Sequence, residues 1–142
     1  MEPLKINNNM LTPEKIAALQ ARVSIVEKGI ILLKEVPYPT EQSVLIIFNQ
    51  IRFLSNKYDH YTIIIDLSEA SRPKAKIRRC INDQFVSLAN RLVHCSYIAT
   101  NPLLQVALRF VMFNSGLDSY SIHSKWEDAL KTVKSEYEQQ CI

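Results

Sequence analysis

Glycine is scarce in this sequence, and its scarcity excludes several kinds of nucleotide site. Only two glycines, Gly29 and Gly116, occur among the 142 residues. A phosphate-binding loop of the P-loop or dinucleotide-binding kind needs several glycines, because the backbone N–H groups must approach the phosphates closely. Neither motif occurs, and the G-x-S-x-G nucleophile motif is also absent. We therefore expect none of these enzyme classes.

Cysteine and histidine are few and widely spaced. The three cysteines are odd in number and form no C-x-x-C pair, so neither a disulfide framework nor a zinc knuckle is predicted. We interpret Cys80 and Cys95 as small core residues, since both fall in apolar segments. The three histidines have no glutamate or second histidine at metal-ligand spacing. The sequence thus predicts a protein that is not an enzyme and holds no metal or cofactor.

Long apolar runs and strong net charge are missing too. No apolar run approaches the roughly 18 residues of a membrane span. The net charge of +3 is small, and no basic stripe alternates with aromatic residues, so nucleic-acid binding is not expected. The first ten residues lack the apolar core of a secretory signal, which makes the cytoplasm the expected location.

The most informative stretch runs from Tyr61 to Arg79. Ile63 to Ile65 are consecutive β-branched residues, as expected of a short strand buried on both faces in a parallel sheet. Asp66 ends this run, and turn and helix-start residues follow it. Ligands and partners of open α/β sheets collect at the carboxyl ends of the strands, so we expect a site between Asp66 and Lys76.

Other elements follow from local patterns. A β-hairpin is expected around Gly29, because glycine suits a turn that needs positive φ. Residues 1–21 are expected to form a loose lead-in with a short helix starting at Thr12 and Pro13, although the same residues could lead directly into a strand. The remaining predicted elements are helices over 41–56, 77–92 and 103–114, strands over 94–100 and 119–123, and a final helix from Ser124 that frays from Glu136.

This order predicts an α/β fold in one domain over residues 22–139. Strand and helix alternate after the hairpin, which requires right-handed crossovers. We expect a mainly parallel sheet of about five strands, with the N-terminal β-hairpin at one edge and four main helices against it. Gly116 is expected to end the helix over 103–114.

The same order resembles the STAS domain family. The likeness rests on the strand end IIIDLS and the closing helix WEDALKTV, and covers roughly Arg22 to Val133. It is similar to the SpoIIAA-like branch, which is also similar to the CRAL-TRIO lipid carriers. The resemblance implies a non-enzymatic regulatory or protein-interaction domain. In phosphoswitch members a serine after the central strand accepts phosphate, but here Ala75 stands at that position and has no hydroxyl.

A basic cluster marks the start of the helix after the central strand, the helix end that ordinarily prefers negative charge. Cations beside free backbone N–H groups would suit a phosphate or carboxylate, whereas the alternative is a solvated face neutralised by Asp66, Glu69 or Glu35. The candidates for binding a partner or an anion in this region are Asp66, Ser68, Ser71, Arg72, Lys74, Lys76 and Arg78.

The helix over 103–114 carries one charge, Arg109, and is apolar nearly all round. It is too short to span a membrane, so it either packs deeply, lines a ligand pocket or forms a dimer interface. Because the helix over 41–56 also has surplus apolar surface, we predict a homodimer. The alternative function is a carrier or sensor of a small apolar or anionic ligand, with Arg72 or Lys74 at the mouth. The pocket or interface candidates are Leu103, Phe110, Met112 and Phe113.

Overall fold

The computed structural model describes residues 11–113 and 119–140, so the expectations for residues 1–10 and Gly116 lie outside the described residues. The first element is helix α2, Pro13–Gln20. Thr12 caps it, because its hydroxyl oxygen accepts a hydrogen bond from the backbone N–H of Lys15 at 3.2 Å. The short helix is therefore confirmed over a direct entry into a strand. Its Leu19 packs against the main core.

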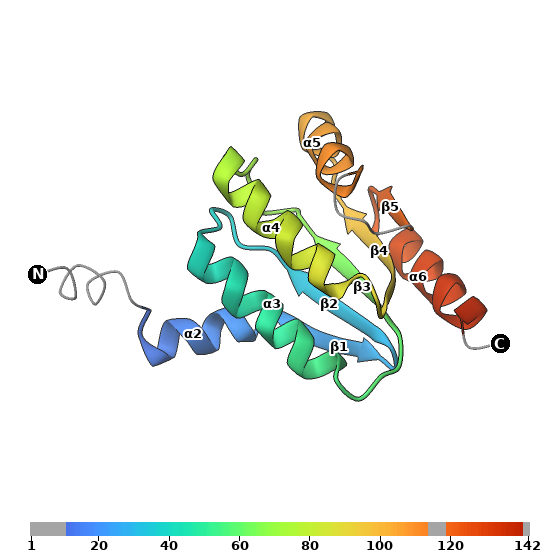
Figure 1. The fold of residues 1–142 in the computed structure, drawn as a ribbon. Coiled ribbons are helices and arrows are strands. Elements are labelled where there is room, and N and C mark those ends of the chain that lie inside the picture. The colour runs from blue at the N-terminus through green and yellow to red at the C-terminus, as the bar shows by residue number, and fades with distance from the viewer. Residues whose placement is uncertain (1–10, 114–118, 141–142) are drawn as a thin grey trace, which may run out of the picture.

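A five-stranded mixed sheet forms the centre of the molecule (Figure 1). Strands β1, Val23–Glu27, and β2, Ile30–Lys34, form the predicted antiparallel hairpin. Strands β3, Tyr61–Asp66, β4, Leu92–Ile98, and β5, Tyr120–His123, continue the sheet in parallel with β2. The strands lie side by side in chain order, so each crossover joins direct neighbours.

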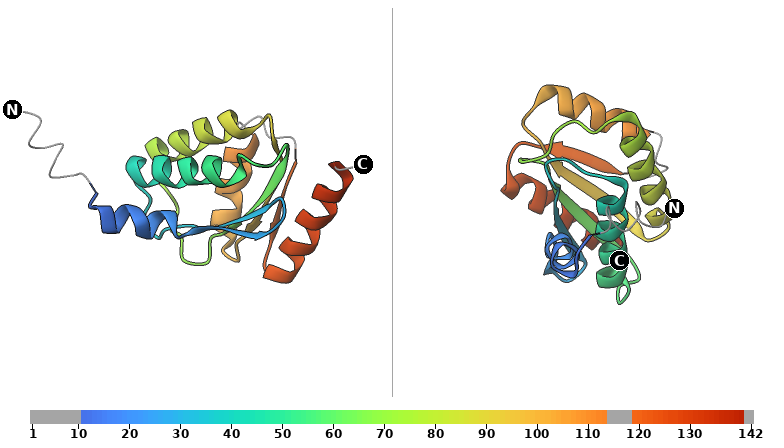
Figure 2. Two further views of the ribbon diagram at one scale, coloured as in Figure 1. Left: turned by 90° about the horizontal axis from the view of Figure 1, so that it is seen from below. Right: turned by 90° about the vertical axis from the view of Figure 1, so that its left-hand side faces the viewer.

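Helices cover the two faces of the sheet unequally (Figure 2). Helices α3, Glu41–Ser55, α4, Ala75–Leu88, and α5, Pro102–Phe113, pack on one face, because right-handed crossovers that advance in one direction all pass on the same side. Helix α6, Trp126–Gln140, follows the last strand and packs on the other face. The larger core therefore lies under α3, α4 and α5.

The three consecutive isoleucines of β3 pack on both faces of the sheet. Ile63 and Ile65 belong to the core under α3 to α5, and Ile64 belongs to the core under α6. Successive side chains of a strand point to opposite faces, so a central strand covered on both sides must be apolar throughout. The prediction of a doubly buried central strand is confirmed, as is the α/β fold.

Two predicted boundaries are wrong. Leu92 was expected on the helix face that includes Leu88, but it begins β4, and a tight turn closed by the Arg91 N–H and the Leu88 carbonyl separates them. Spacing of four residues suits a helix, yet pairing of Leu92 with Tyr61 in the sheet overrides it. The predicted fraying from Glu136 is also wrong up to Gln140, because α6 stays helical there and its Tyr137 ring lies against the hairpin turn.

No helix within residues 11–113 and 119–140 is both long enough and apolar enough to cross a membrane.

Candidate functional site

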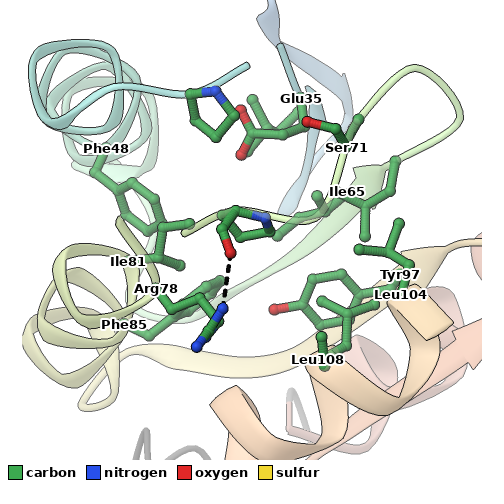
Figure 3. Close-up of a pocket in the computed structure, with 16 residues that line it drawn as sticks. Glu35, Phe48, Ile65, Ser71, Arg78, Ile81, Phe85, Tyr97, Leu104 and Leu108 are labelled. Atoms are coloured by element: carbon green, nitrogen blue, oxygen red, sulfur yellow. Dashed lines mark hydrogen bonds between the residues drawn. The ribbon is translucent and has the colours of Figure 1, made fainter. Parts of the chain in front are cut away.

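An apolar pocket opens at the carboxyl ends of β2, β3 and β4, beneath α3, α4 and α5 (Figure 3). We call it the strand-end pocket. Its floor is one row of side chains across three strands, since Leu33 pairs with Ile65 and Ile65 with Tyr97 in the sheet register. Helix side chains complete the walls: Phe48 from α3, Ile81 and Phe85 from α4, and Leu104, Ala107 and Leu108 from α5.

The strand-end pocket has room for a small ligand group. Its volume is about 60 Å³, counted as the space open to the centre of a water molecule. One water needs roughly 10–15 Å³ on that measure, so the pocket can take several waters or a short branched aliphatic chain. The edge-to-face contact of Phe48 and Phe85, with ring centroids 5.2 Å apart, holds the wall between α3 and α4 in place.

Four polar side chains also line the strand-end pocket. The Ser71 hydroxyl donates to the Pro37 carbonyl at 2.6 Å, and the Tyr97 hydroxyl donates to the Met112 sulfur at 2.8 Å. The other two are Glu35, at the end of β2, and Arg78, on the first turn of α4. Burial raises the pKa of Glu35, and the Val36 N–H and the Arg22 charge oppose that rise. Burial likewise raises the pKa of Tyr97.

A second, more polar hollow of about 490 Å³ adjoins the strand-end pocket, and we call it the outer groove. The two hollows share Pro39, Ser71 and Pro73. Arg72 and Lys74 line the outer groove, and both are exposed. The two cations that were predicted at the mouth of a ligand site therefore lie beside an apolar pocket.

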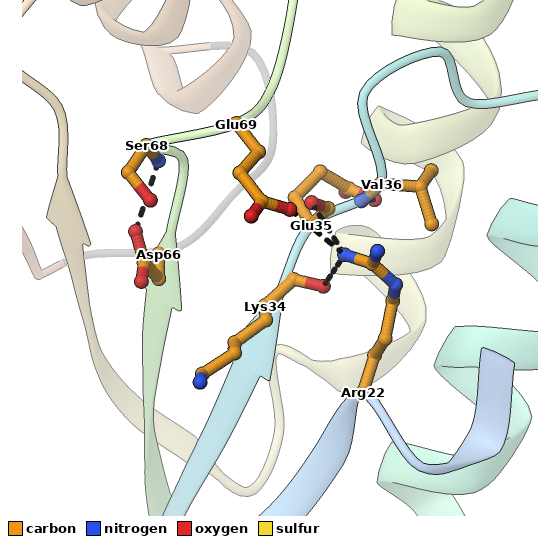
Figure 4. Close-up of polar contacts among 7 residues, drawn as sticks. All are labelled: Arg22, Lys34, Glu35, Val36, Asp66, Ser68 and Glu69. Carbon is orange, nitrogen blue, oxygen red and sulfur yellow. Dashed lines mark hydrogen bonds and ion pairs between the residues drawn. The ribbon is translucent and has the colours of Figure 1, made fainter. Parts of the chain in front are cut away.

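The remaining candidates, Asp66, Ser68 and Lys76, do not line either hollow. The Asp66 carboxylate accepts from the Ser68 N–H at 2.9 Å, which is a local turn contact (Figure 4). Lys76 forms an ion pair with Glu41 at 3.3 Å. The solvated-face alternative therefore applies to Lys76, although its partner is Glu41 and not Asp66, Glu69 or Glu35. Among the residues that the structure describes, no side chain caps the N-terminus of α4 at Lys74.

Arg22, the residue before β1, contacts the backbone at the end of β2 (Figure 4). Its guanidinium donates to the carbonyls of Lys34 and Glu35 at 3.1 and 3.0 Å, and lies 3.8 Å from the Glu69 carboxylate. These contacts fix the backbone that carries the Glu35 side chain. Glu35 was expected only as a carboxylate that neutralises the basic cluster and was missed as a site residue, although the rule that selected Asp66 at the end of β3 applies equally to the end of β2.

The α5 candidates separate into two sets. Met112 is 1% exposed and receives the Tyr97 hydroxyl, so it belongs to the core behind the pocket. Leu103, Phe110 and Phe113 are exposed and do not line the strand-end pocket. Instead α5 contributes Leu104, Ala107 and Leu108. The apolar pattern extends nearly all round the helix, so it does not indicate which side faces inward.

A second polar cluster lies on the α6 side of the sheet, where β4 meets β5. His94 is buried, and its two ring nitrogens lie 2.5 Å from the Ser119 hydroxyl and 2.9 Å from the Ser121 hydroxyl. Ser121 also contacts His123, at 2.8 Å, and Ser96, at 2.8 Å. We call these five residues the serine–histidine cluster. Burial lowers the pKa of His94.

Cysteines and metal-ligating groups form no further site in the described ranges. Cys95 is fully buried, which raises its pKa to about 12, and Cys80 packs against the same core. Both therefore fit the prediction of small core residues. Residues 11–113 and 119–140 contain no group of three or more histidine, cysteine or acidic side chains placed to hold a metal ion.

No protein-family model matches this chain, and no curated protein sequence matches it significantly. The geometry of the strand-end pocket and of α5 is therefore the basis for a functional proposal.

Proposed function

We propose that this protein binds a small, largely apolar molecule in the strand-end pocket and acts as its carrier or sensor. One observation carries the proposal: six elements converge to line an apolar cavity at the carboxyl ends of parallel strands. Protein interiors are ordinarily close-packed, and ligands of open α/β sheets bind at this end. An ordered apolar cavity is also the feature that favours a ligand over a purely protein-binding role.

The polar chemistry of the pocket supports binding rather than catalysis. Among its lining residues, which all lie in the described ranges, none is a histidine, cysteine or lysine. The one serine, Ser71, donates its hydroxyl to the Pro37 carbonyl and not to a side chain that could act as its base. A few polar groups in an apolar wall orient a ligand. The protein is thus proposed to work without a chemical step.

A titration with a neutral apolar probe tests this proposal. 4-Methylpentan-1-ol is added to protein with labelled methyl groups, and the NMR shifts are followed. We expect shifts at Ile65, Leu104 and Leu108, which line the pocket, and none at Ile30 and Ile64 under α6.

A pocket-filling variant provides the matched comparison. Ala107→Phe places a ring in the pocket and is expected to weaken probe binding by about tenfold or more, since one ring occupies most of the space. Ala17→Phe, on the exposed side of α2, is the control and should bind as wild type does. Shifts scattered over both faces, or equal binding by the Ala107→Phe variant, would contradict the proposal.

A second candidate function, a regulatory or protein-interaction module of STAS type, is favoured by the outer surface of α5. Leu103, Val106, Phe110 and Phe113 follow one another at spacings of three and four residues, and all are more than 60% exposed. A row of this kind is typical of an interface. We call it the α5 stripe and propose a second copy of the chain as its partner. The STAS resemblance itself remains a prediction.

A further inference from the structure

Two side chains of opposite charge line the strand-end pocket without pairing. Glu35 and Arg78 both belong to its wall, and in Figure 3 they occupy separate positions around it with no hydrogen bond between them. Within the described residues, neither forms an ion pair with any other side chain; the ion pairs present are Arg22 with Glu69, Lys76 with Glu41, and Lys134 with Glu27. Both residues are partly exposed, and the charge of Arg22 also acts on Glu35. An apolar wall nevertheless disfavours charges that lack a direct partner, so this arrangement points to a ligand.

Each of these side chains is held by one backbone contact that leaves its other polar atoms open. Glu35 Oε1 accepts from the Val36 N–H at 2.9 Å, and Arg78 Nη1 donates to the Pro73 carbonyl at 2.7 Å. In the described part of the chain, Glu35 Oε2 and the Nη2 and Nε groups of Arg78 have no hydrogen-bond partner. The contacts orient the two charged groups in advance, which lowers the cost of binding a ligand to them.

We propose that the ligand of the strand-end pocket is a small zwitterion with an apolar body, the class to which apolar α-amino acids belong. This inference rests on the proposed function. The ligand ammonium group pairs with Glu35, and the carboxylate pairs with Arg78. The aliphatic or aromatic body lies on the row formed by Leu33, Ile65 and Tyr97.

The charges of the pocket disfavour simpler ligands. A singly anionic molecule would face the Glu35 carboxylate, and a singly cationic one would face the Arg78 guanidinium. A neutral molecule in the pocket would displace water from both charged groups without pairing with either of them. Arg72 and Lys74 in the outer groove add positive potential near the shared wall, which favours the carboxylate end of the ligand toward α4.

Four probes of one body size test the inference on the wild-type protein. L-leucine carries both charges, 4-methylpentanoate lacks the ammonium group, 3-methylbutylamine lacks the carboxylate, and 4-methylpentan-1-ol is neutral. Calorimetry at pH 7, with methyl NMR to locate the site, is expected to show L-leucine binding about tenfold or more tightly than each of the others. If the alcohol binds in the pocket as tightly as L-leucine, the zwitterion inference fails and the proposed function stands. If none of the four binds there, the proposed function itself fails.

Two substitutions test the role of each charge. Glu35→Gln should remove the advantage of L-leucine over 4-methylpentanoate, and Arg78→Gln should remove its advantage over 3-methylbutylamine. Arg79→Gln on the exposed side of α4 and Glu138→Gln on α6 are the matched controls and should keep the wild-type order. The inference is overturned if either pocket variant keeps the full preference. The measured quantity is the relative affinity of the four probes for the same folded variant. A modest loss of stability in that variant therefore does not change the result.

Discussion

At the scale of single residues, Gly29 has two independent reasons to be a glycine. Its φ is +78°, in the left-handed region that residues other than glycine adopt only at a cost in free energy. In addition, a Cβ at this position would overlap the ring of Tyr137 from α6. The first reason concerns the turn between β1 and β2, and the second concerns packing between the hairpin and a helix about a hundred residues later.

Gly29→Ala is therefore expected to lower the free energy of unfolding by about 1–3 kcal/mol, measured by urea denaturation. Tyr137→Ala relieves the overlap, so in that background the same change should cost only the roughly 1 kcal/mol of the backbone conformation. Equal costs in the two backgrounds would show that the Tyr137 ring moves aside freely.

At the scale of elements, the serine–histidine cluster connects β4 to β5. Both ring nitrogens of buried His94 contact serine hydroxyls, and these contacts are satisfied with the ring neutral. Burial lowers the pKa of His94; the nearby charge of Glu136 on α6 opposes this shift, and His123 on β5 adds to it. The last parallel strand is thus held partly by a group that resists protonation.

His94 is expected to make the protein less stable as the pH drops below about 6.5, the ordinary histidine pKa, whereas Glu35, whose pKa is raised by burial, acts in the opposite sense at lower pH. In that range the unfolded chain binds a proton at His94 more readily than the folded chain does, so acid favours unfolding. The contribution of one group is at most about 1.4 kcal/mol per pH unit. Urea denaturation of the wild type between pH 5 and pH 8 measures this slope.

Two variants separate His94 from the rest of the chain. His94→Gln should flatten the slope even though it lowers stability at every pH, because a buried contact is lost. His60→Gln removes a histidine from the loop before β3 without touching the cluster, and should keep the wild-type slope. An unchanged slope in His94→Gln would assign the acid sensitivity to another group.

At the scale of the whole molecule, the two helices expected to form a dimer interface differ. Most of the apolar stripe of α3 is buried against the sheet, and its exposed large residues are Leu45 and Phe53. The α5 stripe, by contrast, faces solvent: Phe113 is 86% exposed and Leu103 is 71% exposed. If the protein is a homodimer, the structure favours α5 over α3 as the contact surface.

Light scattering during size-exclusion chromatography is expected to give twice the mass of the chain at high micromolar concentration. Val106→Glu combined with Leu103→Glu should give the mass of one chain, because two carboxylates cannot be buried unpaired in an apolar interface. Phe53→Glu on α3 is the matched control and should remain dimeric. A wild-type protein of single-chain mass would contradict the homodimer and, with it, the proposed role of the α5 stripe.

Local patterns predicted much of the fold and part of the site. The hairpin at Gly29, the doubly buried isoleucines and the parallel order of strands follow from short-range rules of backbone conformation and periodicity. Arg72, Lys74 and Arg78 were selected because they break a local rule at a helix start, and they line the two hollows. Glu35 was missed because its significance depends on Arg78, more than forty residues away in sequence.

The amino-acid sequence alone determined the class of fold, the end of the sheet at which the pocket lies, and the cations beside that pocket, because these depend on interactions between residues near in the chain. Only the tertiary structure decided which side of α5 faces inward, which carboxylate lines the pocket, and that His94 of β4 and His123 of β5 both contact Ser121. These features depend on how separate elements pack, and periodicity specifies that an element has an apolar face without specifying what covers it.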